Sequence, residues 1–450
     1  MSGNRAAAPR AGFRPGMRQG STDGTQDAEA LAMLQVLGSS WALLLGMFML
    51  MIGNGLQGTL LGVRGAIEGF STFEMSVVMS AYFVGFLLAS RIAPVLIRRV
   101  GHVRVFAAMG STISAILILY PTLTEPWAWT VGRMVIGFCF CGVYITAESW
   151  LNDAASNENR GKALSLYMIV QMAGIVLAQY FLVLGDAAGF VLFIIPSVLV
   201  SLAFVPVLFS ASSQMPAFAE TKALSIRRLI AASPLACMGM LLLGSVFAAQ
   251  FGMSAVYGQA AGLSVGQISL MVSVTYLAAL VLQFPIGWLS DRMDRRVLIL
   301  ALSLAGGIGA LVAFAVPGQF WIILLAAGAV GGASNTLYAL LIAYTNDYLE
   351  KEDMAAASAG LLFINGFGAI AGPLVVGWMM EGLGPEGFWF LIALLLLGLA
   401  GYAVWRMRRQ PVKVIVGDRA GYAPIAATAT SVAVGTVAEV AQESTGTQTA

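Results

Sequence analysis

The sequence Gly-Trp-Leu-Ser-Asp-Arg-Met-Asp-Arg-Arg at residues 287–296 is the most informative about the fold, because it places a dense group of charges between two long apolar runs. Residues 266–288 and residues 297–316 form these runs, and neither contains a charged side chain. Each run is close to the roughly 20 residues that an α-helix needs to cross the hydrocarbon core of a bilayer. The stretch therefore predicts a short charged loop at a membrane surface, between two transmembrane helices.

The composition of the whole chain agrees with a membrane environment. Of its 450 residues 59% are hydrophobic and only 10% are charged, and its mean hydropathy is +0.84. A soluble domain carries about 25% charged residues, because its surface faces water. The sequence therefore predicts an all-α integral membrane protein. Its formal net charge of +2 gives no indication of a nucleic-acid partner, and we expect none.

Twelve apolar runs are long enough to span the bilayer, and a hydrophilic interval divides them into six and six. We place the runs near residues 38–60, 73–95, 103–121, 127–149, 162–184, 188–209, 235–256, 266–288, 297–316, 319–342, 356–379 and 386–405. The expected domains are disordered cytoplasmic tails at 1–36 and 407–450, six-helix bundles at 37–209 and 235–406, and a cytoplasmic linker at 210–234.

The positions of the basic residues predict the orientation. Cytoplasmic loops of membrane proteins are enriched in Lys and Arg. With the N-terminus in the cytoplasm, all of the 24 Lys and Arg residues except Arg64, Arg91 and Arg133 fall on the cytoplasmic side. We therefore expect a multi-pass protein of the inner (plasma) membrane with both termini in the cytoplasm.

A faint internal repeat relates the two halves at an offset of about 193 residues. The matched pairs are Gln57 and Gln250, Gly65 and Gly258, Gly69 and Gly262, and Ser71 and Ser264. Six-helix halves in parallel repeat place a solute site between them, near the middle of the membrane.

The loop at 287–296 resembles the signature loop of the major facilitator superfamily, G-x-L-[AS]-D-R-x-G-R-R, with Asp294 in place of its second glycine. The resemblance covers roughly residues 38–405 and implies two pseudo-symmetric six-helix bundles. It also implies a cytoplasmic gating cluster, in which a glycine allows close packing and arginines pair across the seam between the bundles. The members of this cluster are Gly287, Asp291, Arg292, Arg295 and Arg296.

The equivalent loop of the first half, residues 94–104, keeps a glycine and several basic residues. Arg98 stands where the signature acid is expected, and Arg99 follows it. We include both arginines in the gating cluster. The alternative for both loops is simple anchoring by basic residues at the cytoplasmic surface.

Arg133 and Gly137 resemble the R-x-x-x-G pattern of the fourth helix of this superfamily, whose arginine is often linked to coupling or substrate binding. A charge inside a membrane helix is costly and usually faces a polar cavity or a partner. The alternative is that Arg133, only about 9 Å from the outer helix end, extends outward to the surface.

Glu148 and Arg160 complete the predicted gating cluster. Glu148 lies near the cytoplasmic end of its helix, where an ion pair with loop arginines and a role in proton transfer are the two options. Arg160 belongs to an Asn-Arg-Gly-Lys-Ala stretch that resembles the entry to the fifth helix in the superfamily. The glutamate-containing helix end and this loop also resemble a poorly characterised bacterial branch of the superfamily.

Polar and aromatic side chains at mid-depth are the candidates for substrate binding, because a polar group in lipid is unfavourable unless it is paired or hydrated. These candidates are Asn54, Gln57, Tyr82, Arg133, Gln171, Gln250, Tyr276, Asn335, Tyr338 and Asn365, with Gln179 and Gln283 beside them. Hydrogen bonds between helices are the alternative role for each. As a set they predict a cavity rich in amides and phenols and poor in charge, which favours a neutral or zwitterionic solute.

The sequence contains no signature of an enzyme, of a nucleotide site or of a metal site, and we expect no catalytic residue, metal or cofactor. Cys139, Cys141 and Cys237 lie in apolar runs without the spacing of metal ligands. The resemblance implies a monomeric secondary transporter in the lipid bilayer that moves a small-molecule substrate by alternating access. H+ is the expected coupling ion, and uniport stays open.

The first choice for the function is import, with a vitamin-like solute such as riboflavin as one candidate substrate. One alternative is efflux of a drug or metabolite by a transporter of the same fold. The other alternative is a membrane protein that does not transport a solute and acts as a sensor or an assembly factor.

Overall fold

The computed structural model describes residues 23–154, 159–209, 225–409, 421–426 and 428–437. All regular structure in these ranges is helical, and twelve helices are long and apolar enough to cross a membrane. The predicted all-α fold with twelve spans is therefore confirmed.

The first bundle consists of the six spans that come first in the chain. Its helices are α1 (Asp23–Ile67), α2 (Thr72–Val100), α3 (His102–Leu119), α4 (Pro126–Ala154), α5 (Arg160–Leu184) and α6 (Val191–Phe209). The second bundle follows the short helix α7 (Ile226–Ala232).

The seventh span is built from three consecutive elements and is interrupted by a π-helical turn. It comprises α8 (Pro234–Ala248), the π-turn η2 (Ala249–Met253) and α9 (Ser254–Ala260). The remaining spans are α10 (Val265–Ser290), α11 (Arg295–Ala315), α12 (Phe320–Asn346), α13 (Lys351–Leu383) and α14 (Gly387–Arg409). π-turns inside α-helices often occur at functional sites, and this one places Gln250 and Phe251 in the interior.

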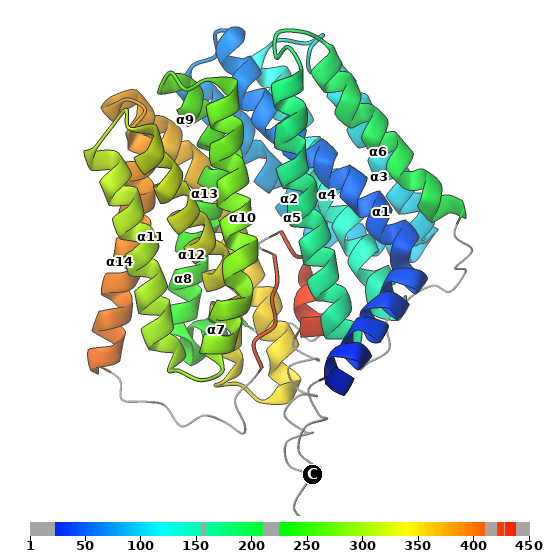
Figure 1. Ribbon diagram of the computed structural model, residues 1–450, viewed down its shortest axis with the longest axis vertical. Coiled ribbons are helices and arrows are strands. Elements are labelled where there is room, and N and C mark those ends of the chain that lie inside the picture. The colour runs from blue at the N-terminus through cyan, green and yellow to red at the C-terminus, as the bar shows by residue number, and fades with distance from the viewer. Residues whose placement is uncertain (1–22, 155–158, 210–224, 410–420, 427, 438–450) are drawn as a thin grey trace, which may run out of the picture.

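The two bundles stand side by side and meet along three helix pairs, α2 with α13, α5 with α10, and α1 with α9. In Figure 1 the lower end of the molecule carries α7 and the end of α14, together with the loop at residues 291–294. We call it the Asp291 end. The opposite end carries the turns before α2 and α10, and we call it the Ser71 end.

The predicted internal repeat appears in the structure as two copies of one turn. Gly69 and Gly262 both adopt a left-handed conformation, with φ of 80° and 73°. Two residues later, Ser71 and Ser264 cap α2 and α10 with the same capping box and nearly the same backbone angles. The sequence match at this offset therefore reflects a real structural repeat.

Loss of either cap is expected to have the same effect on stability. Ser71→Ala and Ser264→Ala each remove a side-chain oxygen that accepts a backbone N–H, which typically costs about 1 kcal/mol. Thermal unfolding of the purified variants in detergent measures both effects. A repeat without structural equivalence would give two clearly different losses.

The side chains sort as expected for a protein in lipid. Large apolar residues such as Phe209, Trp321 and Leu325 are exposed on the outside of the bundles. Gln57, Gln250 and Tyr276, in contrast, are buried inside. Hydrocarbon contacts therefore replace hydration on the outer surface, while uncharged polar groups face the interior.

The ends of the chain differ in part from the predicted disordered tails. The backbone of residues 23–36 is already helical and continuous with α1. Residues 421–426 and 428–437, which we call the C-terminal segment, lie between the bundles, and residues 431–437 are helical. Apolar residues such as Ile425 and Val434 are buried there, which stabilises order in a stretch whose pattern is too weak to predict it.

Other parts of the predicted tails and linker lie outside the described residues. These are residues 1–22, 210–224, 410–420, 427 and 438–450.

Candidate functional site

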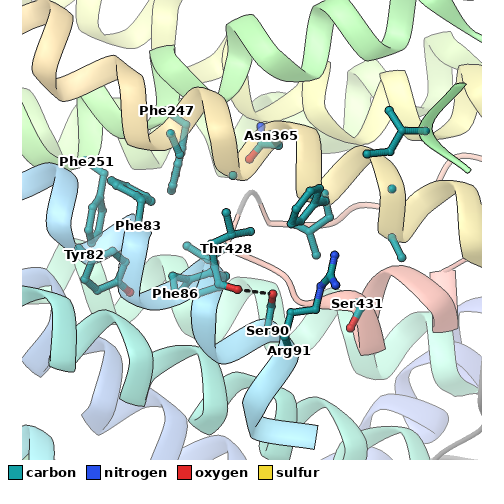
Figure 2. A pocket seen from close by; sticks show the side chains of 18 of the residues that line it. Tyr82, Phe83, Phe86, Ser90, Arg91, Phe247, Phe251, Asn365, Thr428 and Ser431 are labelled. Atoms are coloured by element: carbon teal, nitrogen blue, oxygen red, sulfur yellow. Dashed lines mark hydrogen bonds between the residues drawn. The ribbon is translucent and has the colours of Figure 1, made fainter. Parts of the chain in front are cut away.

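A cavity of about 450 Å³ lies between the two bundles, on the Asp291 side of their middle. Its walls come from α2, the seventh span and α13, and Thr428 and Ser431 of the C-terminal segment also line it (Figure 2). Aromatic rings dominate the lining, namely Tyr82, Phe83, Phe86, Phe247, Phe251 and Phe363. A cavity of this size and composition fits a small molecule with an apolar or aromatic body.

Arg133 lies behind the aromatic end of this cavity. Its guanidinium carbon is 5.0 Å from the centre of the Tyr82 ring and 5.8 Å from that of Phe251. The side chain is 0% exposed, so it does not extend outward to the surface, and that alternative is wrong. None of its three nitrogens has a hydrogen-bond partner within the parts of the chain that the structure describes. Among the described residues, the contacts that stabilise this buried charge are therefore cation–π contacts.

Gly137 explains why Arg133 reaches this place. A Cβ atom at Gly137 would lie 1.9 Å from the carbonyl oxygen of Tyr82, so only glycine allows α4 to approach α2 this closely. Arg133 is one helical turn away on the same face of α4. The R-x-x-x-G pattern thus has a structural explanation here. The glycine allows close packing of α4 on α2, and this packing places the arginine against the Tyr82 ring.

The charge at the mouth of the cavity is also positive. Arg91 lines the cavity, and its guanidinium carbon lies 4.9 Å from the centre of the Phe363 ring. Arg91 is the one charged side chain among the described lining residues. The cavity therefore offers two cations, one at its mouth and one behind its inner end.

The predicted substrate-binding residues are all buried, but they do not form a single site. Tyr82 and Asn365 line the large cavity. Gln179, Gln250 and Tyr276 line a much smaller pocket between α1, α5, α10 and the seventh span. Phe251 lines both spaces, so one ring separates them.

Most of the other predicted residues form hydrogen bonds within the protein. Asn54 donates to the Tyr144 hydroxyl at 3.1 Å, and Gln57 donates to Asn54 at 3.2 Å. Asn335, beside Gln283 in a third small space, donates to a carbonyl of its own helix. The remaining two are Gln171, which accepts from Thr428 at 3.1 Å, and Tyr338, which is buried on α12.

The phenylalanine rings of the lining were not among the predicted site residues, although Tyr82 was. Phe83 and Phe86 are spaced by three residues on α2, and Phe247 and Phe251 are spaced by four across α8 and η2. Such spacing is typical of one helix face and was a usable signal. It was overlooked because apolar rings that line a cavity and those that face lipid look alike in an apolar run.

The predicted gating cluster is built mainly around Arg295, which lies inside the second bundle. Arg295 is 3% exposed, and its Nη1 atom donates to Asp347 Oδ1 at 2.8 Å and to the Ala343 carbonyl at 2.9 Å. Its other nitrogens bond to Ser290 at 3.1 Å and to Asp291 at 3.4 Å. These bonds join α11 to α10 and α12 within the second bundle, whereas the sequence had led us to expect pairing across the seam between the bundles.

The other arginines of the cluster lie nearer the surface. Arg296 pairs with Asp294 at 2.9 Å, and Arg292 lies 4.1 Å from the centre of the Trp288 ring. Arg98 and Arg99 are exposed and form no salt bridge within the described ranges. Arg160 begins α5. The first-half loop thus resembles the anchoring alternative more than a latch.

Glu148 has different partners from those expected. Its carboxylate accepts the backbone N–H of Thr430 and of Ala433, the latter at 3.2 Å, and also the Thr430 hydroxyl. No ion pair with a loop arginine is present among the described residues. The expected ion pair is therefore wrong, because backbone and hydroxyl donors of the C-terminal segment occupy the carboxylate.

Within the described ranges, no three His, Cys, Asp or Glu side chains are grouped as a metal site requires. The described lining of the cavity offers a bound molecule aromatic faces, the Asn365 amide and the Arg91 guanidinium group.

Comparison with known proteins gives the family. The model of the Major Facilitator Superfamily matches residues 43–264 and 235–438. The uncharacterized MFS-type transporter YcaD of Escherichia fergusonii is 24% identical over 357 residues, which are 78% of this chain and 91% of that protein.

Two solved structures have the same fold. The nucleoside transporter NupG superposes with a TM-score of 0.67 at 15% identity, over 83% of this chain and 100% of that one. A bacterial homolog of the human lysosomal transporter Spinster, in an inward-facing and unoccupied conformation, gives a TM-score of 0.63 at 15% identity, over 92% and 98%. At such identities the likeness concerns the fold alone.

Proposed function

Because this chain belongs to the major facilitator superfamily, we propose that it is a secondary transporter of a small organic anion with an aromatic or other apolar body. The solute binds in the cavity between the bundles, and rocking of the bundles exposes that cavity to one side of the membrane and then to the other.

The observation that carries this proposal is the buried, unpaired charge of Arg133. Burial of an ion without a counter-ion costs several kcal/mol, so proteins rarely keep one without a use. A carboxylate or similar group of the solute supplies the missing counter-charge once the Tyr82 or Phe251 ring moves aside. Guanidinium groups bind such planar anions through two parallel hydrogen bonds.

The cavity as a whole supports an acidic rather than a neutral solute. Arg91 adds a second positive charge at the mouth, and no acidic side chain lies among the described lining residues. A neutral or zwitterionic solute was expected from the sequence. A flavin such as riboflavin suits the aromatic walls, but its ring leaves Arg133 without a counter-charge, so we place an organic acid first.

We assign the Asp291 end to the cytoplasm of a bacterial cell, because the basic loops gather there. Since the cavity lies on that side, we infer that the two bundles are arranged as in an inward-facing state. H+ symport during import is our first choice for coupling and direction. Efflux is the alternative direction. Transport measured in membrane vesicles of defined orientation distinguishes it from import.

Benzoate and benzamide test the proposed substrate class, since they share a ring and differ in charge. Benzoate is expected to raise the unfolding temperature of the purified protein in proportion to its binding, whereas benzamide at the same concentration raises it much less. Equal shifts from the two compounds, or a shift from benzamide alone, would contradict the proposal.

Phe251→Ala is expected to weaken benzoate binding about fivefold, because the ring of the solute loses an aromatic partner on the cavity wall and such ring pairs are worth about 1 kcal/mol. Phe367→Ala is the matched control, since Phe367 is also a membrane phenylalanine but is exposed on the outside. Thermal shift as a function of benzoate concentration measures both. The same loss in both variants would show that Phe251 has no special place in the site.

A further inference from the structure

The C-terminal segment lies between the two bundles at the Asp291 end and contacts both of them (Figure 1). In the first bundle it hydrogen-bonds to Glu148 of α4 and Gln171 of α5. In the second bundle it bonds to Asp291, at the end of α10. One short stretch of chain therefore bridges the two bodies that must move against each other during transport.

We propose that this segment is an autoinhibitory plug. While it is seated, a solute cannot pass between the cavity and the Asp291 end, and that end cannot close. This inference goes beyond the proposed substrate class and does not depend on it.

The first anchor of the plug is Glu148. Its carboxylate is 1% exposed and takes hydrogen bonds from two backbone N–H groups and one hydroxyl of the segment. Hydrogen bonds to a charged acceptor are about twice as strong as neutral ones. Without the segment this carboxylate would lose all three of these donors.

The second anchor is the signature loop itself. The Tyr422 ring packs on Gly287, where a Cβ atom would lie 2.6 Å from a ring carbon. The backbone N–H of Tyr422 donates to Asp291 Oδ1 at 3.2 Å. The glycine and the acid of the signature therefore bind the chain's own C-terminal segment in this state.

The body of the plug fills space between these anchors. Its buried members are small or β-branched and offer apolar surface to both bundles. They are Ile425, Ala426, Ala429, Thr430, Ala433, Val434, Thr436 and Val437.

The plug also forms part of the cavity wall. Thr428 and Ser431 line the cavity, and Figure 2 shows them beside Ser90 and Arg91 at the mouth. Closure of the Asp291 end would bring α4 and α5 toward α10, and the segment occupies that position. Alternating access therefore requires the segment to leave its seat.

The test uses the accessibility of the cavity mouth and needs no solute. Ser90→Cys places a thiol on the cavity wall, while native Cys139, Cys141 and Cys237 are buried. In the full-length protein in nanodiscs, a water-soluble maleimide is expected to label this thiol slowly. The chain without Ser90→Cys gives the background.

Two full-length variants release the plug. Val434→Asp and Ala429→Asp each place a carboxylate at a site that is at most 3% exposed, and an unpaired buried charge costs several kcal/mol. Both are expected to raise the labelling rate about tenfold or more and to raise amide exchange in residues 428–437. Gly435→Ala is the matched control, since its Cβ meets nothing within 4 Å and should leave both rates unchanged.

Three outcomes would overturn the proposal. One is faster amide exchange in the segment with an unchanged labelling rate, which would mean that the segment does not block the mouth. Retained protection in both variants would show that the segment is not seated as described. A tenfold increase with Gly435→Ala would show that labelling does not report on release. None of these results depends on benzoate, so failure of the proposed substrate class remains a separate finding.

Discussion

Arg133→Gln is expected to weaken benzoate binding by about 10- to 100-fold, because a hydrogen bond to a charged group contributes about 1.5–3 kcal/mol. Arg133→Lys keeps the charge but loses the forked geometry, so an intermediate loss is expected. Transport of organic acids in proteoliposomes should fall in the same order. Thermal shift with benzoate measures the binding part.

The same substitution should not destabilise the empty protein. Arg133 is 0% exposed and has no hydrogen-bond partner among the described residues, so its removal relieves a desolvation cost and loses only cation–π contacts. The unfolding temperature of Arg133→Gln without ligand is therefore expected to equal or exceed that of the parent. A large drop, with benzoate binding unchanged, would assign Arg133 a structural role instead.

In contrast to Arg133→Gln, Asp347→Ala is expected to destabilise the protein, by about 3–5 kcal/mol. The substitution leaves the buried Arg295 without its main counter-charge. The pair is 2.8 Å long and both side chains are largely inaccessible. Thermal or denaturant unfolding in detergent measures the loss. The double variant Arg295→Met with Asp347→Leu should recover most of it, since no unpaired charge remains.

Arg228→Gln is the control for this prediction. Arg228 pairs with Asp353 at 3.3 Å, but its side chain is 69% exposed, and exposed pairs contribute about 0–1 kcal/mol. A loss with Arg228→Gln as large as that with Asp347→Ala would show that burial does not determine the effect.

The fold was predictable because lipid imposes strong local rules. Each span must be apolar over about 20 residues, and the basic loops must remain on one side. The repeat was also readable, since the turn at Gly69 and Ser71 needs residues of special conformation and its copy at Gly262 and Ser264 needs the same ones. Local physical requirements of this kind leave a clear mark in the sequence.

The site was only partly predictable, because its shape depends on which helix faces meet. Arg133 stood out as a charge in an apolar run, but nothing local showed that Tyr82 and Phe251 would cover it. The partners of Glu148 were also hidden. They lie in a segment almost 300 residues further along the chain, and most of their donors are backbone groups that every residue possesses.

The most direct test of the central claim is the distance between spin labels across the seam at each end of the molecule. One pair joins the ends of α2 and α10 at Arg98 and Arg292, and the other joins α2 and α13 at Phe73 and Leu383, all of them exposed positions. In the Val434→Asp background, which releases the plug, the account predicts that saturating benzoate shortens one distance and lengthens the other, and that Arg133→Gln abolishes this response. Two distances that stay fixed, or that change in the same direction, would contradict it.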